Sequence, residues 1–278
     1  MIQKRNSIIK YFGLAALVTG LFTSCGDETN FSPYKEEVDS NAAFVKLINT
    51  TIGPSGTNFN VIWYLDDDKI SSGATPTNNF LTGTGTGSTF PASTNYAQIP
   101  SGTGSLRVEI PITAAGQAPT TVATSNLATE AQKNYTSFVA GASPNYVTYT
   151  LKDDLSVVAA DPSKAYIRFV NVIPNSPAAG YDLSIKELNS NAVIFSGVKY
   201  LSATETFIAI PTPDDLEAAS FEFQMREVGT TNVVAKVTWS PRKGRVYTLF
   251  NRGYVGGLSA GNPSTTVNIP VLTYFTNK

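Results

Sequence analysis

The residues that could carry catalysis are few, and they are mainly three acidic groups. These are Asp66 to Asp68, Asp153 with Asp154, and Asp214 with Asp215. Two carboxylates about 5 to 10 Å apart across a cleft could hydrolyse a glycosidic bond, but neighbours on one chain segment do not form that arrangement. The sequence contains no histidine, which excludes Ser-His-Asp and Cys-His catalysis. We therefore predict no catalytic residue and no enzyme activity.

Turns offer a plainer role for the acidic groups. Asp66 to Asp68 directly follow the strand-like run 60–65, which predicts a hairpin turn. Asp214 and Asp215 follow Pro211-Thr212-Pro213, so they are expected in a turn as well. Carboxylates in loops also suit calcium, but no Asp-x-Asp-x-Asp-Gly spacing is present. We predict no metal site and no cofactor.

Aromatic rings are the remaining candidates for ligand contacts, because flat rings that face solvent can hold sugars. Alternation along the strand-like runs places Tyr64 and Tyr166 at outward positions, together with either Tyr146 or Tyr149. The alternative is that these rings pack or pair across strands. Asn49 and Asn171 are expected to bond nearby backbone at strand ends. The ligand-binding residues remain unknown from the sequence.

Cys25 is the only cysteine, and it stands where a lipid could be attached. A basic segment and a short apolar run precede it, as in a secretory signal peptide. Phe22-Thr23-Ser24-Cys25 resembles the lipobox of bacterial lipoproteins, in which the cysteine is diacylated and becomes the mature N-terminus. The resemblance predicts a signal peptide at residues 1–24 and lipidation at Cys25. The alternative is an unused thiol behind an ordinary cleaved signal.

Residues 25–41 are polar and acidic, without an apolar period, and predict a flexible tether. Asp27-Glu28 resembles the surface-export signals of lipoproteins from the Bacteroidetes group, and a solvated linker is the alternative. The chain has 20 Lys and Arg against 21 Asp and Glu, which gives no electrostatic case for nucleic acid. The densest basic cluster, Arg242 to Arg245, is expected to be a solvated turn.

The strand-forming motifs that must position these residues occur twice in the sequence. Ala43–Asn49 returns as Ala165–Asn171, each reading small, aromatic, β-branched, basic, apolar, β-branched, Asn. Period two then puts the aromatic and basic residues on the outer face of a half-buried strand. Three further landmarks follow in the same order: Ile-x-Ser-Gly, Ile-Pro and Tyr-Thr-x-Phe-x-x-Gly. This order indicates a duplicated unit, and the extra Gly/Thr run Thr82–Thr89 of the first copy predicts a surface loop.

The residue pattern from residue 42 onward is typical of an all-β protein, because runs of β-branched and aromatic residues are separated by Gly and Pro. Each copy has the length of an immunoglobulin-like sandwich, and Trp63 and Trp239 are expected to anchor the cores. The fold class predicted is therefore all-β, with two tandem immunoglobulin-like antiparallel β-sandwich domains. Their predicted extents are 42–161 and 162–278.

The opening motif and the run Lys243–Gly253 resemble the bacterial domain-of-unknown-function family numbered 4397, with the clearer match in the second copy. The resemblance implies a cell-envelope β-sandwich module and assigns no catalytic residue. We expect a non-enzymatic lipoprotein of the outer membrane, held by its lipid and displaying two domains for binding, adhesion or scaffolding. A glycan-binding or glycan-degrading accessory role in polysaccharide uptake is the alternative. The expected partners are the membrane and either a glycan or another envelope protein, but not nucleic acid.

Overall fold

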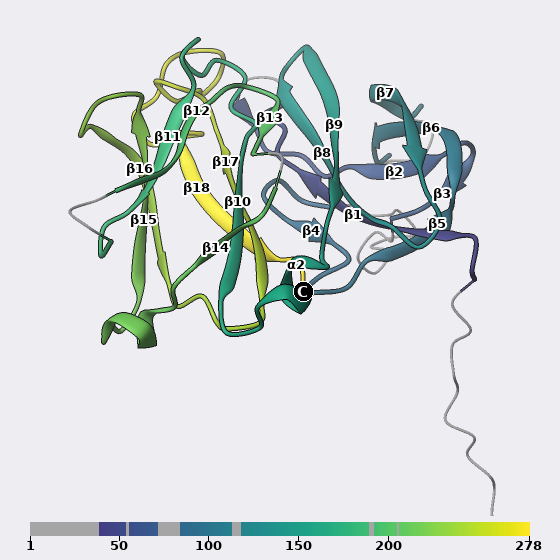
Figure 1. The fold of residues 1–278 in the computed structure, drawn as a ribbon. Helices are drawn as coiled ribbons and strands as arrows, with labels where there is room; N and C mark the ends of the chain where they lie inside the picture. Colours follow the sequence, from purple (N-terminus) through teal and green to yellow (C-terminus); the bar gives the residue numbers. More distant parts are fainter. Residues whose placement is uncertain (1–38, 54–55, 72–83, 113–117, 189–191, 205) are drawn as a thin grey trace, which may run out of the picture. The chain divides into compact units, whose positions relative to one another are not determined.

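The computed structural model describes residues 39–53, 56–71, 84–112, 118–188, 192–204 and 206–278 (Figure 1). Cys25, the signal peptide and almost all of the predicted tether lie outside these residues. Ser40–Lys278 form one compact unit, which contains every strand reported below. No helix among the described residues is long and apolar enough to cross a membrane.

The first repeat forms a five-stranded and a four-stranded sheet. The five-stranded sheet consists of β4 (Thr89–Phe90), β5 (Ala97–Pro100), β1 (Ala42–Asn49), β8 (Asn134–Ala142) and β9 (Asn145–Asp153). The four-stranded sheet has the order β3 (Asp68–Lys69), β2 (Ile62–Leu65), β6 (Gly102–Ile110) and β7 (Thr120–Thr129). The two sheets enclose a core that includes Trp63, as predicted.

The second repeat has the same plan. Its five-stranded sheet consists of β13 (Ser202–Ala203), β14 (Ile208–Ile210), β10 (Ala165–Asn171), β17 (Val246–Arg252) and β18 (Val271–Thr276). Its four-stranded sheet has the order β12 (Val193–Val198), β11 (Tyr181–Ile185), β15 (Phe221–Glu227) and β16 (Val233–Trp239). Two short helices, α2 (Val157–Ala160) and η2 (Pro213–Leu216), lie between strands. The all-β sandwich fold predicted from the sequence is confirmed.

One pair in each five-stranded sheet is parallel, although the other pairs are antiparallel. β1 pairs with β8 and β10 pairs with β17, so that Val45 lies opposite Tyr135 and Ile167 opposite Tyr247. The opening and closing motifs of each repeat are therefore hydrogen-bonded neighbours. The chain between them forms the opposite sheet, which is how the two parallel strands are connected without a crossover helix.

Trp239 centres the core of the second repeat, as expected from its sequence. Its ring is stacked between Phe223, at 3.9 Å between ring centroids, and Tyr274, at 4.1 Å. Offset stacking of this kind adds to the area that the rings bury. Because Phe223 comes from the four-stranded sheet and Tyr274 from the five-stranded sheet, Trp239 joins the two layers.

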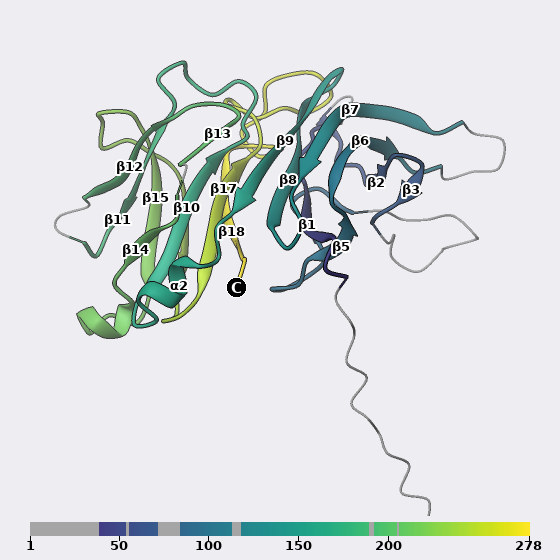
Figure 2. The same cartoon turned by 45° about the vertical axis from the view of Figure 1, so that its right-hand side comes forward.

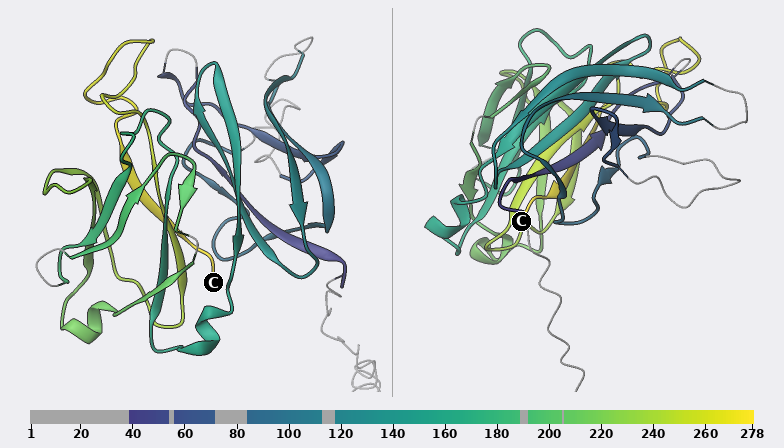
Figure 3. Two further views of the ribbon diagram at one scale, coloured as in Figure 1. Left: turned by 45° about the horizontal axis from the view of Figure 1, so that its top comes forward. Right: turned by 90° about the vertical axis from the view of Figure 1, so that its right-hand side faces the viewer.

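The central strands are buried on both faces, which corrects the prediction of a half-buried strand. Every residue of β10 is buried, and the basic residues Lys46 and Arg168 are 0% and 2% exposed. The outer faces of the two five-stranded sheets pack on each other (Figures 2 and 3). The buried members of this inter-repeat cluster are Ile48, Phe138, Ala140, Val170, Val172, Phe250 and Phe275.

Equivalent residues meet at this cluster. The closing motifs Tyr135–Gly141 and Tyr247–Gly253 make Phe138 and Phe250 equivalent positions, and their rings lie edge to face at 5.6 Å between centroids. A contact between like positions is what a two-fold interface between identical subunits produces. The two repeats therefore pack as a dimer would, within one chain.

The strands β1, β8, β10 and β17 begin at one end of the unit. Asp153, which lies opposite the first residue of β8, contacts Asn277 beside the C-terminal Lys278. The chain enters at Ser40 and ends at Lys278 on this side, which we call the Ser40 end (Figure 1). The segments that follow β1, β10 and β17 lie at the opposite side, the loop end.

Residues 160–278 alone are expected to unfold cooperatively, because the core around Trp239 is built entirely from this span. The fragment would expose the face that carries Val170 and Phe250, so it should self-associate at high concentration. Thermal unfolding and sedimentation would measure both properties, with Phe250→Thr expected to reduce the association. A fragment without a cooperative transition would contradict two separable domains.

Candidate functional site

The basic residue of each opening motif lies under an aromatic ring between the repeats. The Lys46 ammonium is 5.0 Å from the ring centroid of Tyr96, and the Arg168 guanidinium is 4.6 Å from that of Phe207. Tyr96 and Phe207 each stand three residues before the Ile of an Ile-Pro landmark. The same cation–π contact is thus repeated, and it offsets part of the cost of burying a charge.

Lys46 is held by backbone carbonyls. Its ammonium donates to the oxygens of Pro91 at 3.3 Å, Ser93 at 2.8 Å and Asn95 at 2.7 Å. Burial lowers the pKa of Lys46 to about 8, and the charge of Asp153 opposes that shift. The ammonium therefore fixes the segment before β5, and the carboxylate of Asp153, from the same repeat, favours its charged form.

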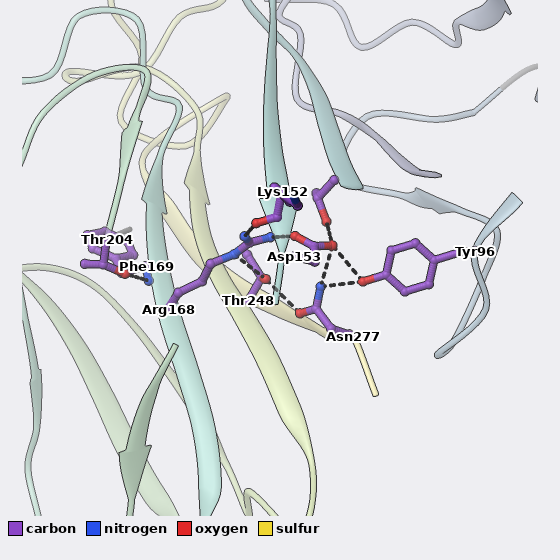
Figure 4. A network of polar contacts seen from close by, with 9 residues as sticks. Tyr96, Lys152, Asp153, Arg168, Phe169, Thr204, Thr248 and Asn277 are labelled. Carbon is purple, nitrogen blue, oxygen red and sulfur yellow. Dashed lines mark hydrogen bonds and ion pairs between the residues drawn. The ribbon is translucent and has the colours of Figure 1, made fainter. Parts of the chain in front are cut away.

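Arg168 instead crosses to the first repeat. Its Nε donates to Thr248 Oγ1 at 3.0 Å, and a terminal nitrogen forms an ion pair with Asp153 Oδ1 (Figure 4). The Lys152 carbonyl accepts a further bond at 3.4 Å. Both charged side chains are almost fully buried, and a buried pair of this kind is maintained only where its hydrogen bonds are satisfied.

Asp153 is the centre of this network and not part of a solvated turn. Its Oδ2 accepts hydrogen bonds from Tyr96 at 2.7 Å, Thr136 at 2.6 Å and Asn277 at 3.3 Å. Burial, and then the charge of Asp153, raise the pKa of the Tyr96 hydroxyl. Asn277 directly follows β18, at the position equivalent to Asp153 in the first repeat, and it accepts a hydrogen bond from Thr248 at 2.7 Å. The carboxylate is fully engaged in holding the two repeats together.

The remaining acidic groups have the turn roles predicted for them. Asp66 adopts a positive φ in the β2–β3 hairpin and accepts a bond from the Ser105 amide at 2.9 Å. Asp215 caps η2 through Thr212 and pairs with Lys243 at 2.6 Å, and the Lys243 bond is the main reason that its pKa is lowered. Among the described residues, no three potential metal-ligating side chains gather in one place.

Asp154, beside Asp153, is exposed and binds only its own loop. It accepts from the amide of Ser156 at 3.0 Å and from its hydroxyl, and these bonds lower the pKa of Asp154. A surface hollow at the Ser40 end is lined by residues of both charges, which include Lys133, Lys152 and Asp154. The neighbouring aspartates thus point to different environments and do not form a carboxylate pair across a cleft.

The four candidate tyrosines are engaged with other residues. Tyr166 is 6% exposed, packs with Phe207 and Val246, and donates to the Asp161 carbonyl at 3.0 Å, which corrects its predicted outward position. Tyr64 lies 4.6 Å from the Arg107 guanidinium. The rings of Tyr146 and Tyr149 are half-buried, against the first-repeat core and the inter-repeat cluster. Tyr149 therefore has the outward face of β9, where the second repeat covers it, and Tyr146 has the inner face.

Asn49 and Asn171 close their strands as predicted. The Asn49 amide donates to the carbonyls of Phe59 at 2.8 Å and Thr84 at 2.9 Å. The Asn171 amide donates to Val198 at 2.9 Å, and its oxygen accepts from Asn251, a partner that the sequence did not reveal. Both side chains therefore brace the loop end.

Residues 43–180 match the family described as "Domain of unknown function (DUF4397)". The resemblance stated from the motifs is thereby confirmed for this segment, while the lipoprotein signal remains a prediction. The match covers the first repeat and ends before β11 of the second. The motif Lys243–Gly253 lies outside the matched residues, so the clearer resemblance expected of the second copy stays a prediction.

No curated protein matches the chain significantly. Among solved structures, a proposed cell adhesion protein from Parabacteroides distasonis ATCC 8503 is 7% identical, with 86% of this chain and 99% of that chain covered. The TM-score of this similarity is 0.19. A similarity at this level carries no structural or functional argument.

Arg168→Met is expected to lower the free energy of unfolding by about 3 to 5 kcal/mol, because it leaves Asp153 buried without its counter-charge. The double variant Arg168→Met/Asp153→Leu should recover most of that loss. Lys236→Met, which breaks an exposed pair with Glu222, serves as the control and should change stability much less. Denaturant unfolding of wild type, Arg168→Met, Asp153→Leu, the double variant and Lys236→Met measures this, and additive losses from the two single changes would contradict a coupled pair.

The contribution of Lys46 to stability should increase with pH between about 8, its pKa in the folded state, and 10.5, the ordinary pKa of a lysine. In this window the folded protein has lost the Lys46 proton and the unfolded chain has kept it, so rising pH favours folding. The unfolding free energy of wild type minus that of Lys46→Met should rise by on the order of 1 to 3 kcal/mol. Denaturation at several pH values tests the sign, and a constant or falling difference would contradict it.

Proposed function

Residues 43–180 of this chain belong to the DUF4397 family, and on that premise we propose that the protein is a non-enzymatic cell-envelope lipoprotein. Cys25 would carry the lipid, and the two sandwich domains would serve binding, adhesion or scaffolding at the outer membrane. The family's description assigns no activity. The proposal therefore depends on the residues and geometry of this chain.

The observation that carries the proposal is the position at which the chain enters the folded unit. Ser40 and Lys278 lie at one end, and the segments after β1, β10 and β17 lie at the other (Figure 1). A lipid attached ahead of Ser40 would hold the Ser40 end toward the membrane. The loop end would then face outward, where the loops of a sandwich commonly bind partners.

The contacts between the repeats also favour a binding module over an enzyme. Asp153, the most buried of the candidate carboxylates, is occupied by Arg168, Tyr96 and Thr136. A glycosidase would need a free acid and a second carboxylate across a cleft. These bonds instead support a rigid block that presents its loops in a fixed arrangement, and this favours glycan binding over glycan degradation within the alternative role.

Metabolic labelling with a fatty-acid probe should mark the wild-type protein and leave Cys25→Ala unmarked, because Cys25 is the only thiol in the chain. Phe22→Leu is the matched control. It places at this position the residue that the lipobox family prefers and should retain full labelling. Equal labelling of wild type and Cys25→Ala would remove the lipid anchor from the proposal.

A partner protein in the envelope would be recognised by crosslinking in intact cells followed by co-purification. A defined stoichiometric partner would support the scaffold role, whereas retention on a polysaccharide would support glycan binding. Turnover of a polysaccharide that single Asp→Asn changes abolish would contradict the non-enzymatic assignment.

A further inference from the structure

Arg252, the last residue of β17, lies at the loop end where the two repeats meet. Alternation along β17 places it on the same side as Thr248 and Phe250, which face the first repeat. The equivalent residue of the first repeat is Ala140, which is buried in the inter-repeat cluster. The second repeat thus has a long cation where the first has a methyl group.

The guanidinium lies on Gly87 of the first repeat. A Cβ at Gly87 would be 2.8 Å from Arg252 Nε and 3.3 Å from Cζ, so any side chain there would displace the guanidinium. Gly87 also has a φ of +81° and donates to the Asn49 carbonyl at 2.6 Å. It belongs to the extra Gly/Thr run of the first copy, whose turn is closed by a bond from the Ser88 amide to the Gly85 carbonyl.

Arg252 has no counter-charge among the described residues. It is half-buried, and burial lowers the pKa of its guanidinium. No hydrogen bond or ion pair involves this side chain among the described residues, whereas Arg168 and Arg107 both pair with carboxylates. The internal segments that are not described contribute a single acidic residue, Glu205. Partial desolvation of an unpaired cation costs free energy that an incoming anion would recover.

The surrounding loops are fixed by contacts between themselves. Asn175 forms two bonds with the backbone of Val255, at 3.0 and 2.8 Å, and so joins the segments after β10 and β17. Asn268 donates to the carbonyls of Leu258 and Gly56, which joins the second repeat to the first. Loops that are already ordered lose less entropy when a ligand binds.

The loop end also carries polar and apolar groups that could contact the ring of a sugar acid. A hydroxyl group comes from the exposed Ser88 of the turn, and exposed apolar side chains come from Val255, Val267 and Ile269. A pyranose ring has hydroxyls, an apolar face of C–H groups and, in a uronic acid, one carboxylate. A planar guanidinium matches that carboxylate by two parallel hydrogen bonds.

We propose that Arg252 and the Gly85–Ser88 turn form a binding site for the carboxylate of an acidic, uronate-containing glycan. This inference rests on the proposed role as a binding module and names the chemical class of its ligand. The site is composite, because the cation comes from the second repeat and the turn on which it lies comes from the first. The packing of the two repeats therefore creates it.

The test measures binding of polygalacturonate by the purified full chain, with neutral galactan and polyglutamate as the other probes. Wild type should bind polygalacturonate best, and Arg252→Gln should bind it at least about tenfold more weakly, the effect of losing a hydrogen bond to a charged group. Lys199→Gln, which removes the same charge from an exposed side chain, should bind as wild type does. Thermal unfolding should show Arg252→Gln as stable as wild type or more stable, because an unpaired desolvated charge has been removed.

The remaining outcomes overturn the inference. They are failure of wild type to bind polygalacturonate, equal binding by wild type and Arg252→Gln, and equal weakening in Lys199→Gln. Polyglutamate bound as tightly as polygalacturonate would reassign the site to acidic peptides. Binding of galactan that ignores Arg252 would overturn this site and leave the binding module intact. Labelling at Cys25 is measured separately, so failure of the lipid anchor is distinguished from failure of the site.

Discussion

The structure depends on the burial of two cations between two sheets. Lys46 and Arg168 project from central strands onto faces that a single sandwich would leave in water, and the other repeat covers them. A charge removed from water must find partners in the protein, or the sheets would separate to rehydrate it. The carbonyls around Lys46 and the carboxylate of Asp153 are those partners, so the polar network and the apolar contact stabilise one interface together.

The two repeats share one sequence pattern, but they stabilise the buried basic residue of that pattern by different partners. Asp153 and Asn277 occupy equivalent positions, and each accepts a hydrogen bond from the threonine of its own closing motif. Only the first repeat supplies a negative charge, and it is the arginine of the second repeat that uses it. The Asp153 carboxylate pairs with Arg168 and not with Lys46, so the two repeats have different roles at the interface. Two identical repeats would have equivalent roles.

This asymmetry extends to the loop end. Ala140 of the first repeat completes the apolar contact, while Arg252 at the same position of the second extends beyond it onto Gly87. The Gly/Thr insertion is present only in the first copy, and it supplies the surface on which this arginine lies. Two differences between the copies, Asp153 against Asn277 and Ala140 against Arg252, therefore lie where the repeats meet.

The sequence by itself determined the features that depend on neighbours along the chain. Duplication, the all-β class, the hairpin turn at Asp66 and the turn at Asp215 follow from local pattern and turn chemistry, and the structure bears them out. The strand-end role of Asn49 was also predicted, although its partners Phe59 and Thr84 are 10 and 35 residues away. The positions of Trp63 and Trp239 in the cores were also predicted, because the alternation of apolar and polar residues identifies the face that each sheet buries in its own sandwich.

Only the tertiary structure decided what covers the other face. Alternation placed Tyr166, Lys46 and Arg168 on a common side but could not show that a second sheet or a short helix lies over it. Asp153 looked like half of a loop pair because its partners are 57 and 124 residues away at Tyr96 and Asn277. Contacts at that separation depend on how two folded repeats pack, which no local periodicity encodes.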